Sequence, residues 1–112
     1  MYTYKIDKII RIVDGDTIDV LINLGFNVSI KQRIRLKGIN AAETRTLNLE
    51  EKKKGLDAKE WLIKELSRER EWIIKTFKED KYGRILGILY YENETININD
   101  KMINEGIAKP YM

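Results

Sequence analysis

Residues 4–36 read YKIDKIIRIVDGDTIDVLINLGFNVSIKQRIRL, and three β-rich runs alternate with two turn signals in this stretch. Isoleucine and valine recur through residues 4–13, 17–24 and 28–36, and such β-branched residues favour strands. Asp14-Gly15-Asp16 separates the first two runs, and a Gly25-containing segment separates the next two, as expected of hairpin turns. The stretch therefore predicts a three-stranded meander.

Apolar and polar residues alternate along the third run. One side of this strand carries Val28, Ile30, Gln32, Ile34 and Leu36. The other side carries Ser29, Lys31, Arg33 and Arg35. A period of two is typical of a half-buried strand, so the apolar side should face the core. Arg35 then ends the polar side, directly before a loop.

The spacing becomes helical after residue 48. The positions that form one stripe at this spacing are Ala58, Trp61, Leu62, Glu65 and Leu66. They predict a helix over about 49–68, with Gly55 as a weak point inside it. Asn48 followed by Glu51 resembles a capping box at its start.

The remaining residues predict two more strands and a short helix. The strands are expected at 71–77 and 84–91, and the helix is expected to begin at Asn99 or Asp100 and to end at a left-handed Gly106. Three strands, a helix, two strands and a short helix are the plan of an OB-type barrel. We therefore expect residues 1–112 to form one domain, mainly β with helices, around a five-stranded barrel.

Composition limits the available chemistry. The 112 residues include no cysteine and no histidine, which excludes disulfides, a thiolate zinc site and histidine general-base catalysis. Any metal would need oxygen ligands, which points to a hard cation such as calcium or magnesium. The net charge of +3 permits a polyanionic partner without requiring one.

The sequence also bears on location and assembly. It contains no apolar run long enough to span a membrane and no apolar signal region near its start. The expectation for the chain as given is a cytoplasmic protein, with secretion left open for a processed form. A monomer is the default expectation for its oligomeric state.

Two polar segments are candidates for a site. The first is Asp14-Gly15-Asp16, which would ordinarily be only a hairpin turn. The second places Arg35 on a strand and Asn40, Glu43 and Thr44 in the following loop, which could equally be a solvated loop with a surface salt bridge. Neither segment is decisive alone.

Taken together, these segments resemble the staphylococcal nuclease, or thermonuclease-like, family. The matching blocks occur in the family's order and at close to its spacing. They are Val13–Thr17, Arg35–Leu36 with Ala42–Thr44, Glu51-Lys52 with Gly55 and Ala58, Asp80–Arg84, and Asn99 with Gly106–Lys109. The resemblance covers about residues 5–111 and implies an OB-fold barrel that hydrolyses phosphodiester bonds of DNA and RNA with calcium.

The resemblance also implies a role for each matching position. Carboxylate ligation of the metal falls to Asp16, a second ligand position to Asn40, a backbone-carbonyl ligand position to Ala41, and an acid near the metal to Asp14. Phosphate binding falls to Arg35 and Arg84, and activation of water to Glu43. Contacts with the nucleotide fall to Lys81, Tyr82 and Tyr111.

These residue types suit the reaction independently of the family. Attack of water on a phosphodiester adds negative charge to the equatorial oxygens, and planar arginines can bind those oxygens through two donors at once. A hard cation can bind a phosphate oxygen and lower the pKa of the attacking water. Since the chain has no histidine, Glu43 is the natural group to position that water or take its proton.

The chain departs from the family pattern at two positions. Asn40 stands where the family often has a carboxylate, which should weaken calcium binding. Ala42 stands where the family usually has proline, which should leave this loop more mobile. Two alternatives therefore stay open: a non-catalytic OB-fold module that binds single-stranded nucleic acid, and a protein-interaction module that uses the barrel surface.

Overall fold

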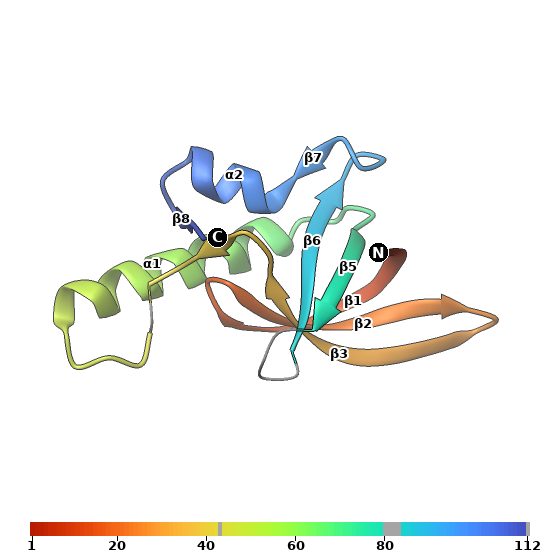
Figure 1. The fold of residues 1–112 in the computed structure, drawn as a ribbon, viewed down its shortest axis with the longest axis horizontal. Helices are drawn as coiled ribbons and strands as arrows, with labels where there is room; N and C mark the ends of the chain where they lie inside the picture. The colour runs from red at the N-terminus through yellow and green to blue at the C-terminus, as the bar shows by residue number, and fades with distance from the viewer. Residues whose placement is uncertain (43, 80–83, 112) are drawn as a thin grey trace.

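Five long strands curve into a closed barrel in the computed structural model, which describes residues 1–42, 44–79 and 84–111 (Figure 1). The strands are β1 (Tyr2–Asp14), β2 (Thr17–Gly25), β3 (Val28–Leu36), β5 (Ile73–Glu79) and β6 (Ile85–Tyr91). Neighbours in the order β3-β2-β1-β5-β6 are antiparallel, and a parallel pairing of β3 with β6 closes the ring. The predicted five-stranded barrel, mainly β with helices, is confirmed.

Strand β1 is irregular in a way that bends it around the barrel. Its register against β2 shifts three times, between Ile6 and Lys8, between Ile9 and Arg11, and between Ile12 and Asp14. Such bulges increase the local twist and curvature of a strand. As a result, Ile6, Ile9 and Ile12 all pack against the core although they are three residues apart.

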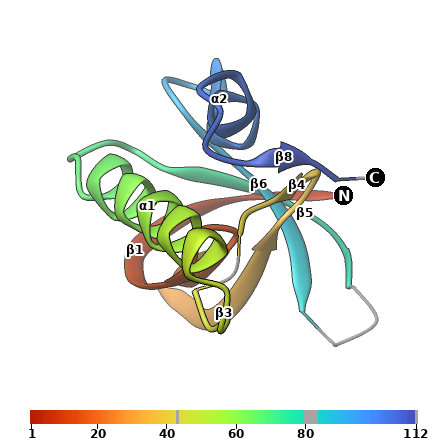
Figure 2. The same cartoon turned by 90° about the vertical axis from the view of Figure 1, so that its left-hand side faces the viewer.

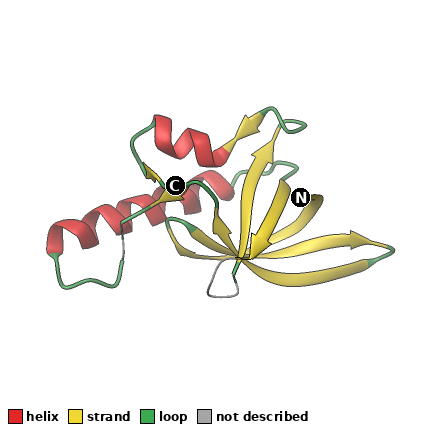
Figure 3. Cartoon of the chain, in the orientation of Figure 1, coloured by secondary structure: helices red, strands yellow, loops and turns green. Residues whose placement is uncertain are grey.

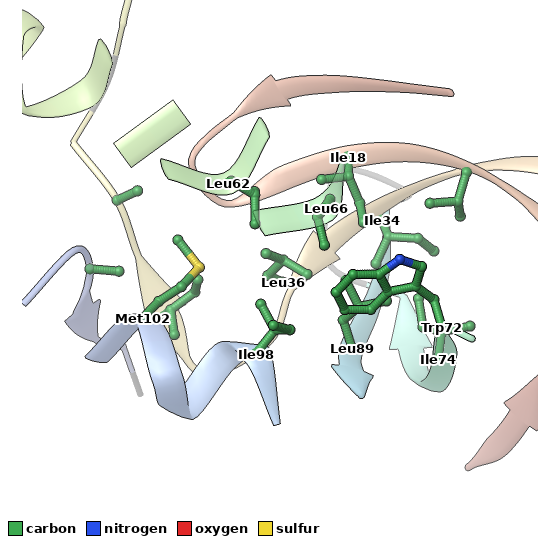
Figure 4. Close-up of a cluster of buried hydrophobic side chains, with 14 of the residues drawn as sticks. Ile18, Ile34, Leu36, Leu62, Leu66, Trp72, Ile74, Leu89, Ile98 and Met102 are labelled. Atoms are coloured by element: carbon green, nitrogen blue, oxygen red, sulfur yellow. The ribbon is translucent and has the colours of Figure 1, made fainter. Parts of the chain in front are cut away.

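The core fills the barrel and extends beneath both helices (Figure 4). The fully buried side chains include Ile18, Ile34, Leu36, Leu62, Ile74, Leu89, Ile98 and Met102. The apolar face expected for β3 is therefore confirmed at Ile34 and Leu36. Val28 and Ile30 on the same strand are exposed, because the β2–β3 hairpin projects beyond the barrel (Figure 1).

Helix α1 (Leu49–Leu66) lies along one side of the barrel and ends two residues before the predicted boundary (Figure 2). The Asn48 side chain accepts a hydrogen bond from the Glu51 backbone at 3.1 Å, as expected of an N-cap. The backbone N–H of Asn48 donates to Thr46 Oγ1 at 3.2 Å, so this threonine takes the place that a capping box gives to Glu51. No helix in the described ranges is long and apolar enough to cross a membrane.

Helix α2 (Ile98–Asn104) follows β6 and begins at Ile98, one residue earlier than predicted. Gly106 lies just beyond its end with φ of +74°, which confirms the predicted left-handed residue. Asn99 is buried and donates hydrogen bonds to the Lys37 and Gly87 carbonyls at 2.7 and 3.2 Å. This amide ties α2 to β6 and to the end of β3.

Three two-residue strands complete the structure, and all three were missed from the sequence (Figure 3). They are β4 (Ile39–Asn40), β7 (Ile96–Asn97) and β8 (Lys109–Pro110). Strand β7 extends the main sheet beside β6, whereas β4 and β8 pair only with each other. The β4–β8 pairing brings the end of the described chain back to the loop that follows Arg35.

Candidate active site

A single cleft collects most of the residues that the sequence marked. It has a volume of about 1140 Å³ and lies beside the closing strands of the barrel. Seven of the predicted site residues line it, namely Asp14, Asp16, Arg35, Asn40, Ala41, Arg84 and Tyr111. The other three, Glu43, Lys81 and Tyr82, lie outside the described residues.

Strand register brings Asp16 and Arg35 together. Thr17 on β2 pairs with Arg35 on β3, and the Leu36 N–H donates to the Asp16 carbonyl at 2.7 Å. Arg35 Nη2 lies 3.5 Å from Asp16 Oδ2, and the two side chains are only 12% and 14% exposed. Arg35 Nη1 donates to the Leu36 carbonyl at 2.9 Å, so the guanidinium is held at both of its outer nitrogens.

The Asp16 carboxylate is oriented by two further donors. Thr17 Oγ1 donates to Oδ1 at 3.0 Å, and the Ala41 backbone N–H donates to Oδ2 at 3.2 Å. A carboxylate oxygen has two lone pairs, so Oδ1, with one donor, keeps acceptor capacity, whereas Oδ2 already faces the Ala41 N–H and Arg35 Nη2. Asp16 is thus a fixed, largely buried carboxylate and not merely a solvated turn residue.

Gly15 explains why this turn can approach the rest of the site so closely. A Cβ atom at this position would lie 2.8 Å from Ala58 Cβ of α1 and 2.9 Å from Ala41 Cβ. Real Cβ atoms do not come so near to one another, so any side chain at residue 15 would push the turn away from α1. The Asp-Gly-Asp segment is therefore a hairpin turn that also packs directly against Ala58 of α1 and against Ala41.

Asp14 holds the loop that leads to α1. Thr44 Oγ1 donates to Asp14 Oδ1 at 2.6 Å. This bond fastens the residue directly after Glu43 to the β1–β2 turn. The anchored threonine directly precedes Arg45, which lines the cleft.

The second predicted arginine enters from the neighbouring strand. Arg84 directly precedes β6, and the parallel β3–β6 register pairs Ile34 with Ile85 and Arg35 with Leu86. Arg84 and Arg35 therefore reach the same cleft from adjacent strands, each within one residue of this parallel contact. Two arginines so placed can bind different oxygens of one phosphate group.

Tyr111 and Asn40 are positioned by the small β4–β8 sheet. Asn40 pairs with Lys109, and the Tyr111 N–H donates to the Gly38 carbonyl at 2.9 Å. The Arg35 guanidinium carbon lies 5.8 Å from the centre of the Tyr111 ring. Stacking on an aromatic face leaves the edge of a guanidinium available to an anion.

Sequence reasoning missed several basic side chains that also line the cleft. These are Arg11, Arg33, Lys37 and Arg45. The alternation along β3 already placed Arg33 on the side of Arg35, and this signal could have found it. Arg11 could not be found this way, because the bulges in β1 break the period of two.

The oxygen donors of the cleft can be compared with the needs of a hard cation. Among the described residues, no three acidic side chains gather into one group. The donors on hand are the Asp16 carboxylate, with spare acceptor capacity, the exposed Asn40 amide and the backbone carbonyl of Ala41. Such all-oxygen donors fit calcium or magnesium, and the low charge of the set fits weak binding.

Fold and site together define a class: an OB-type barrel whose cleft combines a fixed carboxylate with arginines of the kind that bind phosphate groups. The family profile described as "Staphylococcal nuclease homologue" matches residues 33–112. The chain therefore belongs to the staphylococcal nuclease family.

Individual relatives agree with this assignment. A protein named "Micrococcal nuclease" from Shigella flexneri is 34% identical over 111 residues, which cover 93% of this chain and 57% of that protein. An "Uncharacterized endonuclease" from Escherichia coli is 32% identical over 93% of this chain and 60% of its own length. A "Thermonuclease" from Staphylococcus hyicus is 29% identical over 91% and 57%. The chain thus spans somewhat more than half the length of these relatives.

Proposed function

We propose that this chain is a metal-dependent nuclease that hydrolyses phosphodiester bonds of DNA, RNA or both. The observation that carries the proposal is the meeting of Asp16, Arg35 and Arg84 in one cleft, which they reach from the β1–β2 turn, from β3 and from the residue before β6. Nuclease names among the relatives support it. Binding of phosphates alone needs the arginines, whereas hydrolysis that uses a cation also needs a carboxylate in the same cleft.

In this proposal the two arginines bind the scissile phosphate. Arg35 is preoriented by Asp16 and the Leu36 carbonyl, so little further ordering is needed when substrate arrives. Negative charge grows on the phosphate oxygens as the bond to water forms and the bond to the leaving oxygen breaks. Arg35 and Arg84 stabilise that charge, and Glu43 orients the water or accepts its proton.

A divalent cation, calcium first among the candidates, would be held by Asp16, Asn40 and the Ala41 carbonyl. When bound, it supplies positive charge that lowers the pKa of water and offsets the charge of the phosphate. Asp14 would not bind the cation directly but would hold the adjacent loop through its hydrogen bond from Thr44. Lys81, Tyr82 and Tyr111 would contact the nucleotide. The expected weakness of the site follows from the neutral Asn40 amide.

One experiment tests the proposal against its alternative. The protein is incubated with a labelled single-stranded oligonucleotide in calcium, in magnesium and in chelator, and cleavage and binding are both followed. We expect cleavage that requires a divalent cation. Binding without cleavage under every condition would contradict the nuclease and favour a non-catalytic single-strand binder, for which Asn40 is the one favourable feature. Neither binding nor cleavage would favour a protein-interaction module.

A further inference from the structure

Basic side chains continue beyond the cleft along the outward face of β1, β2 and β3. Paired residues on these three strands form successive rows across the sheet. The row at the cleft is Asp14–Thr17–Arg35, the next is Arg11–Asp19–Arg33, and the third is Lys8–Leu21–Lys31. The second and third rows thus bring together four cations and one carboxylate, and Lys8, Arg11, Lys31 and Arg33 form what we term the basic track.

Asp19 organises the track and is not a competing anion within it. Its side chain is only 6% exposed, and it accepts from Arg33 Nε at 2.8 Å and from Arg33 Nη2 at 3.2 Å. The hydrogen bonds from Arg33 lower the pKa of Asp19, to which nearby Lys31 and Arg11 also contribute. The carboxylate is therefore covered, whereas the Arg33 side chain stays half exposed and held in one orientation.

The track is continuous with the candidate active site. Arg11 and Arg33 line the same cleft as Arg35. Successive rows are two residues apart along β2 and β3, which corresponds to about 7 Å along an antiparallel strand, whereas the bulges in β1 make the step there three residues. That separation is comparable to the distance between neighbouring phosphates of an extended single strand, so one row can meet one phosphate.

We infer that the basic track binds the sugar-phosphate backbone of a single nucleic-acid strand, DNA or RNA, as it leaves the cleft. This inference rests on the proposed function and extends it, because it makes the enzyme favour substrates longer than the nucleotides at the cut. Arg11 and Arg33 bind the phosphate next to the scissile one, and Lys8 with Lys31 binds the phosphate after it.

The track has a defined end. The fourth row is Lys5–Asn23–Ser29, and the neighbouring Asp7 accepts hydrogen bonds from Asn23, at 3.1 Å, and from Ser29. Lys5 in that row is paired with Glu71 at 3.1 Å. Negative charge and neutral polar groups therefore replace the basic side chains at this end of the track. The gain in affinity with strand length should stop after about two added phosphates.

The experiment measures binding in chelator, so that cleavage does not interfere. Labelled oligothymidylates of two, four and eight nucleotides are titrated by fluorescence anisotropy at several salt concentrations. The variant is Lys8→Ser with Lys31→Ser, since both side chains are exposed and neither makes an ion pair with another residue that the structure describes. The control is Lys64→Ser with Arg68→Ser, which removes the same charge from two exposed positions, one in the last turn of α1 and one just after the helix.

For the wild type we expect affinity to rise from two to four nucleotides and then to level off. The variant should bind the eight-nucleotide probe about tenfold more weakly, and its salt slope should fall by about 0.7, because Lys8 and Lys31 together contact one phosphate and each phosphate contact of a single strand contributes about 0.7. The control should match the wild type.

Equal affinities in variant and wild type, or an equal loss in the control, would overturn the inference. A wild-type affinity that does not depend on strand length would also overturn it. If, in addition, anionic vesicles bound the wild type but not the Lys8→Ser, Lys31→Ser variant, the basic track would be a membrane-binding surface instead. The proposed function is separable from these outcomes, because it fails when the wild type cleaves no oligonucleotide in calcium or magnesium, whatever the anisotropy shows.

Discussion

Two clusters of arginine and carboxylate lie in different parts of this barrel, and they are built differently. In the cleft, Arg35 and Asp16 lie 3.5 Å apart, and the space beside them is open. Between the end of α1 and α2, the carboxylate of Glu65 lies 3.0 Å from Arg70 Nη1 and 2.9 Å from Lys101 Nζ. The first cluster leaves donors and acceptors for a ligand, and the second uses its carboxylate within the protein.

Aromatic rings strengthen this contrast. Arg70 lies 3.9 Å from the centre of the Tyr91 ring and 5.7 Å from that of Trp72. Burial of Glu65 opposes its ionisation, yet hydrogen bonds from Lys101 and Arg70 still lower its pKa below the ordinary value. A buried charge satisfied in this way contributes to structure, so we expect mutations in the two clusters to affect different properties.

The largest expected effect is on turnover. Arg84→Ala and Glu43→Gln should each lower the turnover of single-stranded DNA at least about a hundredfold, since in the proposed mechanism each removes a group that acts on the transition state. Circular dichroism should show folded proteins in both cases. A folded variant with near-normal turnover would remove that residue from the mechanism.

The second effect is a loss of stability from a mutation in the Glu65 cluster, without a loss of turnover. Glu65→Gln leaves Arg70 and Lys101 without their shared carboxylate and should lower the free energy of unfolding by about 3 kcal/mol, as measured by urea denaturation. Turnover by the folded fraction should stay unchanged. Glu60→Gln, at an exposed position on the same helix, is the matched control and should change stability by less than about 0.5 kcal/mol.

A smaller effect concerns the metal. Asn40→Asp adds a negative charge to the proposed ligand set and should tighten calcium binding about tenfold in titration calorimetry. Equal dissociation constants for the two proteins would show that Asn40 is not a ligand position.

The smallest effect is a pH dependence at the Glu65 cluster. Because the folded state lowers the pKa of Glu65 below the ordinary value of 4.5, the stability that it contributes is present above that pH and is lost as the pH falls through the folded pKa. Unfolding free energy should therefore fall more steeply below pH 4.5 in the wild type than in Glu65→Gln. Parallel pH profiles would contradict this assignment.

The same two clusters show what the sequence could and could not reveal about the fold. Helical spacing placed Glu65 on the stripe of α1 that faces the core, and Glu65 is indeed buried. Its partners could not be inferred, because the position of Arg70 depends on the path of the connection from α1 to β5 and that of Lys101 on the docking of α2. In the same way, the period of two found β3, whereas two-residue strands such as β4 and β8 are too short to show any period.

The site was predictable to a similar extent. Family resemblance marked Asp16, Arg35 and Arg84, and the cleft brings these three together. The roles of these residues, and of Glu43, Lys81 and Tyr82 outside the described residues, stay predictions. The place of Arg11 in the cleft could not be predicted from the sequence, because it arises from the bulges that shift the register of β1.

The most direct test exchanges arginine for lysine in each cluster. Arg35→Lys keeps the charge but loses planar, two-donor binding of phosphate, so kcat should fall about a hundredfold with little change in the free energy of unfolding. Arg70→Lys should leave kcat unchanged and lower the free energy of unfolding by about 1–2 kcal/mol, because the contact with the aromatic rings is lost. A folded Arg35→Lys protein that retains the wild-type kcat would contradict the account.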